Sequence, residues 1–488
     1  MARILGEPYQ IYEFKAERIK VGINRYLWMP EHGYYAQYLY GRPYLTVSPL
    51  FEALGEALAV LFDVADADRA KTILSKSPVT DFGVTCIFPQ IPGIPPYHND
   101  AIWPFVQSYW NLAAAKAGNE QALNHGLAAI YRAGALFLTN YENFVAGTGD
   151  FDGTEINSDR MLWSMAGNLA MVHRVFMGMS LEADGIRFQP VVPKTYPGKK
   201  TLRNFHYRNA VLNITVNGFG NQVKTILLDG KPLKDAFLPA NTAGVHTVEI
   251  ELQNNDFSQQ PIHLVPNHFT LPNPQARRDG NLLKWDAVEG ASHYLVYKNG
   301  QFLEKTSAAQ LEIKGISQQF AEYKVSAVDQ KGNESFSSEP VVFVNDSAVK
   351  IFEMETFTPA SDLPYSNFSG SGFVEISTEK NRRIECRIDV ESAGEYFLNI
   401  HYSNGSGPWN TDNKCAIRSL TVNGSYAGVL VFPQRGKDEW SDWGFSNSRS
   451  VLLQKGENTV VISFEDWNNN MNVDVNTAML DYLSVVRK

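Results

Sequence analysis

Two short stretches of this chain combine side chains that could do chemistry on a sugar. Residues 97–104 read Tyr-His-Asn-Asp-Ala-Ile-Trp-Pro and place an imidazole, an amide, a carboxylate and an indole in a loop that leads into a helix. Residues 141–143 put Glu142 between a tyrosine and an asparagine at the end of the next helix. Rings can stack on a sugar, amides can bond its hydroxyls and a carboxylate can transfer a proton. The combination predicts a sugar-cleaving pocket, as in a glycosidase.

Helices are expected to position both stretches. Up to residue 187 the apolar residues recur at three-to-four spacing, which predicts helices, and the loops between them are rich in glycine and proline. The predicted helices span residues 50–62, 101–117, 121–138 and 160–179. Pairs of helices joined by alternating short and long loops indicate an array of α-hairpins.

Beyond residue 187 the periodicity becomes alternating, which predicts strands. The predicted strands span residues 210–216, 225–228 and 246–252. Asp229-Gly230 predicts a hairpin turn between strands. We therefore expect a small β unit over residues 188–254 and a proline- and asparagine-rich linker over residues 255–274.

The next segment, residues 275–345, also alternates in the manner of strands. Its motifs at residues 282–286, 293–297 and 322–335 resemble the early and late strands of a fibronectin type III domain. The resemblance covers the whole segment and implies a β-sandwich that acts as a spacer.

The last segment, residues 346–488, contains Phe-Glu-Met-Glu near its start and Met-Leu-Asp-Tyr-Leu near its end. It resembles the β-sandwich carbohydrate-binding modules that carry a structural calcium ion. The resemblance implies that Glu353, Glu355 and Asp481 hold this ion. Alternation places Glu353 and Glu355 on one face of a strand, as shared coordination by hard oxygen ligands requires. The alternative is two solvated carboxylates on an edge strand.

The same resemblance implies sugar contacts from aromatic and amide side chains in the loops of this module. The candidates are Tyr402, Asn404, Trp440, Trp443, Trp467 and Asn468. An indole face packs against a sugar ring, and an asparagine both donates to and accepts from its hydroxyls. The alternative is that some of the tryptophans belong to the core of the sandwich.

The helical segment resembles glycosidases built on an (α/α)6 toroid. The resemblance is closest to the six-hairpin clan of processing α-glucosidases, mannosylglycerate hydrolases, trehalases and neutral invertases. It rests on the order of five motifs, at residues 27–35, 97–104, 141–143, 147–150 and 162–164. Residues 1–187 are accordingly expected to form part of the toroid, and residues 188–254 the small C-terminal β-sandwich that follows it. The expected fold class is multidomain, with α/α-toroid hairpins followed by all-β sandwiches.

The resemblance also implies roles for individual residues. Glu142 corresponds to the general base. The expected substrate-binding residues are Trp28, Tyr34, His98, Asn99, Asp100, Trp103 and Trp163. His98 has no second histidine or cysteine at ligand spacing, so no metal or cofactor is expected in catalysis.

Glu142 has alternatives that the sequence leaves open. It could be an ordinary carboxylate at the end of a helix, solvated or paired with a cation. Asp150 and Glu155 lie close enough in sequence to be rival bases, and Glu155 is the stronger rival because residues 153–157 are expected to begin the next helix.

One departure from the toroid pattern concerns its size. Residues 1–187 have room for only about half of the helices of a complete toroid. The family's general acid lies upstream of the hairpin at residues 27–35, and Glu7, Glu13 and Glu17 do not sit in the acid motif. We therefore expect the C-terminal half of a longer enzyme, which would expose a broad apolar helix face.

Composition and charge narrow the class of partner. The chain has 488 residues, of which 44% are hydrophobic and 19% charged, as in a soluble protein of several domains. A net charge of -9 and the lack of a basic stripe argue against nucleic acid. No apolar run is long enough for a membrane span, and the first residues lead into no signal-type apolar core. The expected partner is an oligo- or polysaccharide.

The cysteines do not suggest a metal site. Cys86, Cys386 and Cys415 lack metal-ligand spacing, and only Cys386 with Cys415 could form a bridge. Free, partly buried thiols are the favoured interpretation. The binding module and the resemblance to bacterial enzymes imply an extracellular or periplasmic location, although the chain shows no signal peptide.

Two functions from different classes follow. The first is a glycoside hydrolase, expected to be inverting and exo-acting on α-linked glycosides, that its terminal module delivers to polysaccharide. The second is a catalytically incomplete fragment that only binds carbohydrate. A phosphorylase or lyase on the same helices is a weaker alternative, because no glycine-rich anion-binding loop begins a helix.

Overall fold

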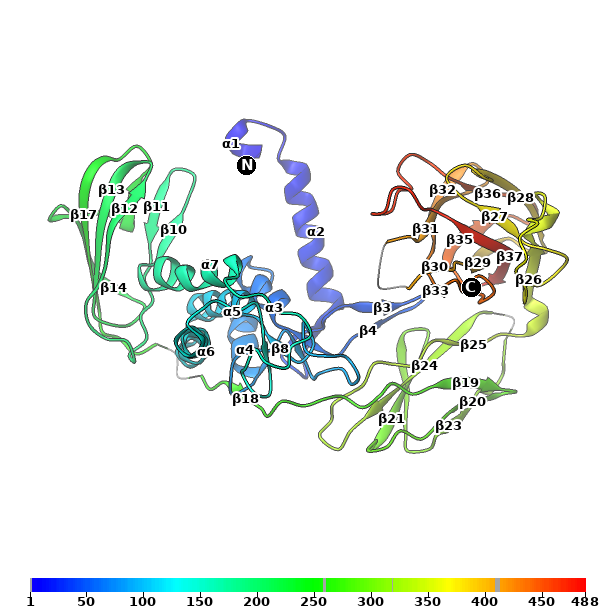
Figure 1. The fold of residues 1–488 in the computed structure, drawn as a ribbon, viewed down its shortest axis with the longest axis horizontal. Helices are drawn as coiled ribbons and strands as arrows, with labels where there is room; N and C mark the ends of the chain where they lie inside the picture. The colour runs from blue at the N-terminus through cyan, green and yellow to red at the C-terminus, as the bar shows by residue number, and fades with distance from the viewer. Residues whose placement is uncertain (1, 258–259, 318, 409–412) are drawn as a thin grey trace. The chain divides into compact units, whose positions relative to one another are not determined.

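A computed structural model describes residues 2–488 except 258–259, 318 and 409–412. The chain forms two compact units. Unit 1 contains residues 1–39, 47–272 and 331–336, and unit 2 contains residues 40–46, 273–330 and 337–488. Across the described residues the chain is mostly β-sheet, and its longer helices all belong to unit 1 (Figure 1).

The helices of unit 1 are α1 (Ala2–Leu5), α2 (Gln10–Tyr26), α3 (Ala53–Leu61), α4 (Ala67–Lys76), α5 (Pro104–Ala117), α6 (Glu120–Phe137) and α7 (Leu162–Ala170). Four of them, α3, α5, α6 and α7, lie where the periodicity predicts them, with shifted ends, whereas α1, α2 and α4 were not predicted. A π-helix, Met171–Phe176, continues α7. Capping explains several ends: Asn119 accepts from the N–H of Ala122 before α6, and Gly118 ends α5 in the left-handed region.

Helix α5 is the centre of the helical part, and α3, α6 and α7 pack around it. Close approach depends on small residues. A Cβ at Gly126 of α6 would lie 1.8 Å from Oδ1 of Asn111 in α5, and one at Gly167 of α7 would lie 2.1 Å from Oγ of Ser108. The predicted α-hairpins are thus present as packed pairs, while their membership of a toroid stays a prediction.

Short strands tie the loops of unit 1 together. They are β1 (Trp28–Met29), β2 (Tyr34–Tyr35), β3 (Leu39–Gly41), β4 (Leu45–Val47), β5 (Phe51–Glu52), β6 (Pro78–Val79), β7 (Ile87–Phe88), β8 (Ala101–Ile102) and β9 (Phe144–Val145), of which β3 and β4 run into unit 2. Pairing of β8 with β9 sets Ala101 opposite Val145 and Ile102 opposite Phe144. This pairing brings the two chemistry-bearing stretches of the sequence to one place.

The predicted small β unit begins slightly earlier than expected. Its strands are β10 (Met179–Leu181), β11 (Gly185–Phe188), β12 (Lys200–Tyr207), β13 (Asn209–Asn217), β14 (Val223–Leu228), β15 (Lys231–Pro232), β16 (Phe237–Pro239) and β17 (Ala243–Leu252). They form a three-stranded sheet, β10-β11-β16, and a five-stranded sheet, β12-β13-β17-β14-β15. The predicted turn joins β14 to β15, with Asp229 and Gly230 both at positive φ.

The segment predicted as a linker is partly held against the helical part of unit 1. Its strand β18 (His263–Leu264) pairs in parallel with β6, and Phe269 forms a bridge with Gln90. Proline and asparagine composition predicts irregular backbone but cannot reveal such pairing.

The spacer segment of unit 2 consists of a three-stranded sheet, β19-β20-β23, and a four-stranded sheet, β22-β21-β24-β25. Its strands are β19 (Ala276–Asp279), β20 (Leu282–Trp285), β21 (His293–Lys298), β22 (Gln301–Thr306), β23 (Gln310–Glu312), β24 (Ala321–Val328) and β25 (Val341–Phe343). Leu283, Trp285 and Val296 are buried, as alternation predicts. The fibronectin type III resemblance stays a prediction.

The terminal segment is a sandwich of a six-stranded and a four-stranded sheet. The first sheet contains β26 (Val349–Glu353), β27 (Val374–Ile376), β29 (Gly394–Ser403), β34 (Gly444–Phe445), β35 (Arg449–Leu453) and β37 (Ala478–Arg487). The second contains β28 (Arg383–Val390), β31 (Ala416–Val422), β32 (Ser425–Phe432) and β36 (Gly456–Ser463), and β30 (Ser406–Gly407) pairs separately with β33 (Gly436–Lys437). The alternating apolar residues of both sheets form one core.

One expectation for this segment is wrong. Strand β26 ends at Glu353, and Met354–Thr356 forms a 3-10 turn, so Glu355 does not share a strand face with Glu353. Alternation along a strand cannot place a side chain that lies beyond the strand's end.

Unit 2 also contains a short segment from early in the sequence, residues 40–46. The Nζ of buried Lys324 in β24 lies 3.4 Å from the carbonyl oxygen of Tyr40, 3.3 Å from that of Tyr44 and 3.2 Å from Oγ1 of Thr46. It lies 3.9 Å from the buried carboxylate of Glu322. The ammonium group of Lys324 thus binds residues 40–46 to strand β24.

Two further expectations can be compared with the structure. Cys86, Cys386 and Cys415 are all free, as favoured. Among the helices of the described residues, none is long and apolar enough to cross a membrane.

Candidate functional site

The carboxylate of Glu142 lies in the loop after α6, and the fold fixes it from two sides. Its backbone N–H donates to the carbonyl oxygen of Ser158 at 2.9 Å and to Oδ1 of Asn157 at 3.2 Å. The hydroxyl of Tyr97 donates to its Oε1 at 3.2 Å. Glu142 is only 5% exposed. Its carboxylate is therefore held in place, unlike a solvated group at a helix end.

Aromatic rings of the loop at residues 97–104 and of Trp163 in α7 pack against one another and reach this carboxylate through Tyr97. The indole of Trp103 donates to the carbonyl oxygen of Tyr97 at 2.6 Å and stacks on the imidazole of His98 at 4.8 Å. The Trp163 ring, at the start of α7, lies 6.0 Å from that of Trp103 and is exposed. Burial and the charge of Glu142 raise the pKa of the Tyr97 hydroxyl, so it remains a donor. We call Tyr97, His98, Trp103, Trp163 and Glu142 the Glu142 cluster.

The side chain of Asn99 forms hydrogen bonds with the backbone of the proline-rich loop. Its Nδ2 donates to the carbonyl oxygens of Ile91 and Ile94, both at 3.0 Å, and its Oδ1 accepts from the N–H of Ile91 at 2.7 Å. The side chain is buried and three of its hydrogen bonds shape the proline-rich loop. Its amide therefore positions Tyr97 and His98, and sugar binding by Asn99 itself stays a prediction.

Asp100 is also buried and held by partners that the sequence did not suggest. Its Oδ1 accepts from Asn267 at 2.6 Å, and its N–H donates to Oε1 of Gln90 at 2.7 Å. Burial raises the pKa of its carboxyl, against the hydrogen bond from Asn267. Asn267 belongs to the segment predicted as a linker, and no local signal marks it.

The rival bases lie differently from expectation. Residues 153–157 form turns, so the predicted helix start at Glu155 is wrong, and α7 begins at Leu162. Glu155 is exposed, although its N–H donates to the carbonyl oxygen of Pro96. Asp150 accepts from the N–H of Asp152 in its own loop. Of these three carboxylates, Glu142 is the one that accepts a hydrogen bond from the hydroxyl of Tyr97.

Trp28 and Tyr34 lie on the β1–β2 hairpin. The ring of Trp28 contacts Tyr35 at 5.0 Å and lies under the guanidinium of Arg69. Tyr34 is buried against Phe51, and burial raises the pKa of its hydroxyl. The structure gives these rings no described contact with the Glu142 cluster, so their subsite role stays a prediction.

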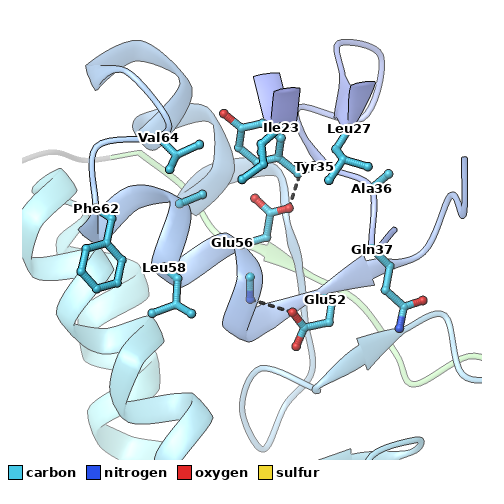
Figure 2. Close-up of a pocket in the computed structure, with 12 residues that line it drawn as sticks. Ile23, Leu27, Tyr35, Ala36, Gln37, Glu52, Glu56, Leu58, Phe62 and Val64 are labelled. Carbon is cyan, nitrogen blue, oxygen red and sulfur yellow. Dashed lines mark hydrogen bonds between the residues drawn. The ribbon is translucent and has the colours of Figure 1, made fainter. Parts of the chain in front are cut away.

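A pocket between α2 and α3 does not contain the Glu142 cluster. Its volume is about 330 Å³, and its walls are apolar except for a few groups such as Glu52, Glu56 and Gln37 (Figure 2). A pocket of this character suits an apolar group better than a sugar.

In the terminal sandwich, Glu353, Glu355 and Asp481 converge on one loop. A Cβ at Gly370 would lie 2.6 Å from Oε1 of Glu355 and 2.9 Å from Cδ of Glu353. The Ser369 hydroxyl lies 2.8 Å from Oε2 of Glu353 and 3.1 Å from Oδ1 of Asp481. Burial, with the charges of the other two carboxylates, raises the pKa of Glu353. Three acids thus meet here, and Nδ1 of His401 lies 2.7 Å from Oδ2 of Asp481, the other oxygen of that carboxylate.

This acidic cluster is compatible with calcium but is not a ready-made ligand set. Within the described ranges, no three His, Cys, Asp or Glu side chains are arranged to hold a metal ion directly. Oε2 of Glu355 is buried without a hydrogen-bond partner, while its Oε1 accepts from the N–H groups of Ser371 and Gly372. An all-oxygen donor set with one unused buried oxygen fits a hard cation.

The predicted sugar-contacting residues of the module divide into two groups. Tyr402, Asn404 and Asn468 are buried, and Asn404 donates to the carbonyl oxygens of Lys414 and Phe432. Trp467 is 68% exposed, while Trp440 and Trp443 are partly buried, and Trp440 stacks on Tyr365 at 5.6 Å. Trp467 is thus the candidate whose ring is exposed, whereas Asn404 supports the loop.

Part of this chain is similar in sequence to parts of carbohydrate-processing enzymes. No family model matches the chain. Over 125 residues it is 29% identical to a cycloisomaltooligosaccharide glucanotransferase of Niallia circulans, covering 25% of this chain and 12% of that enzyme. Over 108 residues it is 32% identical to mannan endo-1,4-beta-mannosidase B of Piromyces sp, covering 22% of this chain and 16% of that enzyme. The chain therefore spans less than a fifth of the length of either relative.

Among solved structures, a family 35 carbohydrate-binding module from Clostridium thermocellum is similar at 22% identity and a TM-score of 0.22, covering 29% of this chain and 98% of that one. About a quarter of this chain is thus similar to parts of enzymes that process glucans and mannans.

Proposed function

We propose that this protein is a glycoside hydrolase in which Glu142 is the general base. The observation that carries the proposal is a buried carboxylate that Tyr97 fixes beside a wall of aromatic rings. Similarity of about a quarter of the chain to sugar-processing enzymes supports the same class. Inversion and exo action on α-linked glycosides complete the proposal, on the resemblance to six-hairpin glycosidases.

The chemistry assigned to this cluster is activation of water. The carboxylate of Glu142 would take a proton from the attacking water, and Tyr97 would keep the acceptor oxygen oriented. Trp103 and Trp163 would hold the sugar ring. An inverting enzyme needs a second carboxyl group about 6.5–9.5 Å away as the acid. The resemblance places that acid upstream of the hairpin that contains Trp28.

Replacing Glu142 tests this assignment. Glu142→Gln keeps the shape and the contact with Tyr97 but removes the base, so hydrolysis of aryl glycosides and disaccharides should fall about a hundredfold or more. The matched control is Glu155→Gln, which alters an exposed carboxylate in the irregular segment between α6 and α7. Equal loss in both variants, or turnover retained by Glu142→Gln, would refute Glu142 as the base.

Carbohydrate binding without turnover is the second candidate function. The exposed ring of Trp467 and the acidic cluster of the terminal sandwich favour it, because neither depends on Glu142. No hydrolysis by the unaltered chain, together with polysaccharide binding that Trp467→Ala weakens, would establish this function instead of the first.

We further propose that Glu353, Glu355 and Asp481 hold a structural calcium ion, which would neutralise three neighbouring carboxylates. Calcium at about 100-fold above its Kd should then stabilise the folded chain by about 2.7 kcal/mol. Thermal unfolding with calcium or with a chelator measures this effect. Glu355→Gln should abolish it, whereas Glu375→Gln, which alters a carboxylate paired with Lys380, should not. Identical melting with calcium and chelator would refute the site.

We also propose an extracellular or periplasmic location in a bacterium, on the resemblance to carbohydrate-binding modules and six-hairpin glycosidases. Its partner there would be an oligo- or polysaccharide.

A further inference from the structure

Helix α2 packs against unit 1 only near its C-terminal end, where Ile23 contacts the core and Asn24 donates to the carbonyl oxygen of Val64. None of its 17 residues is buried, and Ile19 and Tyr12 are 62% and 63% exposed. Figure 1 shows it standing away from the other helices of unit 1. A helix of this length is only marginally stable alone in water, and helices in proteins normally gain stability from a packed apolar face. Exposed apolar side chains on a helix with so few packing contacts indicate an interaction surface.

The apolar residues on one side of α2 have the spacing of a coiled-coil seam. They are Tyr9, Tyr12, Ala16, Ile19, Ile23 and Tyr26, separated by three, four, three, four and three residues. We call these six residues the α2 seam. An alternation of three and four places them along one stripe that suits the same stripe on a second helix.

The charged residues beside the α2 seam discriminate between two orientations of such a pair. Glu13 and Lys20 directly follow Tyr12 and Ile19, while Lys15 directly precedes Ala16. Two parallel copies would set Lys15 of one helix against Lys20 of the other. Two antiparallel copies would set Glu13 against Lys20 on both sides of the two-fold axis. Flanking charges set the orientation of a coiled coil, so these residues favour the antiparallel pair.

In the antiparallel register, Tyr12 of the second copy would lie next to the pocket between α2 and α3. When Ala16 of one helix faces Ile19 of the other, Tyr12 faces Ile23. Ile23 lines the pocket of about 330 Å³ together with Leu27 and residues of α3 (Figure 2). A phenol ring matches the apolar walls, and its hydroxyl supplies a donor near the two carboxylates of the pocket.

The state of those carboxylates fits this occupant. Glu52 already accepts from the N–H groups of Leu54 and Gly55, and Oε1 of Glu56 accepts from that of Tyr35 at 2.6 Å. Oε2 of Glu56 is buried without a partner, and none of the described residues that line the pocket is basic. A donor brought in from outside would therefore meet acceptors and no competing cation.

We propose that this surface is the interface of a homodimer in which two α2 helices pack antiparallel along the α2 seam. Each copy inserts Tyr12 into the pocket of the other. The isologous arrangement closes on itself and buries the same residues twice. This inference is independent of the function proposed for Glu142.

Sedimentation velocity of the full chain over a range of concentrations tests the proposal. The unaltered chain should form dimers, and Ile19→Glu should make it monomeric. Phe14→Glu is the matched control, because Phe14 is equally exposed on the opposite side of α2 and should leave the dimer intact. A circular-dichroism melt of each variant verifies that it is folded. A monomer at every concentration would overturn the proposal and assign the surface to a different helical polypeptide.

A charge reversal tests the orientation. Glu13→Lys and Lys20→Glu should each raise the dimer dissociation constant about tenfold, and the double variant should restore it. Glu13 also pairs with Arg3 of its own copy. Arg3→Gln removes that internal pair alone and should leave the dimer dissociation constant unchanged. A dimer that Ile19→Glu leaves intact, or a double variant that fails to restore it, would overturn the proposed pairing.

Discussion

Lys324→Met is expected to lower the free energy of unfolding of unit 2 by about 3–5 kcal/mol, the usual cost of removing one partner from a buried ion pair. The side chains of Lys324 and Glu322 are 3% and 1% exposed, so the remaining carboxylate would stay buried without its cation. The carbonyl oxygens of Tyr40 and Tyr44 would lose their donor as well.

Urea denaturation of the full chain measures this effect, and a matched control is available on the surface. Lys350→Met removes an ammonium that pairs with exposed Glu391 at 3.2 Å, and should change stability by less than about 1 kcal/mol. The double variant Glu322→Gln with Lys324→Met should be more stable than Lys324→Met alone, because the orphan charge is gone. Equal losses for Lys324→Met and Lys350→Met would contradict the role given to the buried pair.

The same pair predicts a pH dependence. Burial raises the pKa of Glu322 from its ordinary value of 4.5 to about 7, against the attraction of Lys324. The folded state then binds this proton more tightly than the unfolded state. Stability from this group is therefore greatest below about pH 4.5 and falls as the pH rises toward 7. Glu322→Gln should flatten the dependence over that window, and an unchanged slope would contradict the shift.

Asn99→Ala is expected to cost about 2–4 kcal/mol, because it leaves two carbonyl oxygens and one N–H of the proline-rich loop without their partner. The loop carries Tyr97, so the hydrogen bond to Glu142 should weaken with it. Loss of loop order should appear as faster hydrogen exchange over residues 91–99.

Two further variants distinguish the structural role of Asn99 from sugar binding. Asn99→Asp keeps the acceptor for the N–H of Ile91 but cannot donate, so it should recover only part of the stability. His98→Ala alters an exposed neighbour and should leave stability nearly unchanged. Full stability of Asn99→Ala together with weaker sugar binding would contradict a structural role and favour the predicted substrate contact.

Local pattern predicted several elements of this fold, although it missed helices α2 and α4. Helices α5 and α6 and strands β13 and β17 follow from spacing, because one buried face leaves a repeating signature in the sequence. Their ends depend on caps and neighbours, which explains why α3 begins at Ala53 after a short strand instead of at residue 50.

The environment of the candidate site could be predicted only in part. The Tyr97 and Glu142 stretches do meet, yet the pairing of β8 with β9 that brings them together leaves no local pattern. Asn267 reaches Asp100 from a segment that composition marks as a linker. The acidic cluster shows the converse: Glu353 and Glu355 lie close together although the strand alternation that suggested it ends at Glu353.

The path of the chain through its units limits how the protein can be divided for experiments. Because residues 40–46 belong to unit 2, a fragment ending near residue 272 would carry that stretch without Lys324. A fragment starting near residue 273 would leave the ammonium of Lys324 buried with its acceptors missing. Neither cut reproduces the intact protein, so binding and stability are best compared on the whole chain, or on a fragment to which residues 40–46 are joined anew.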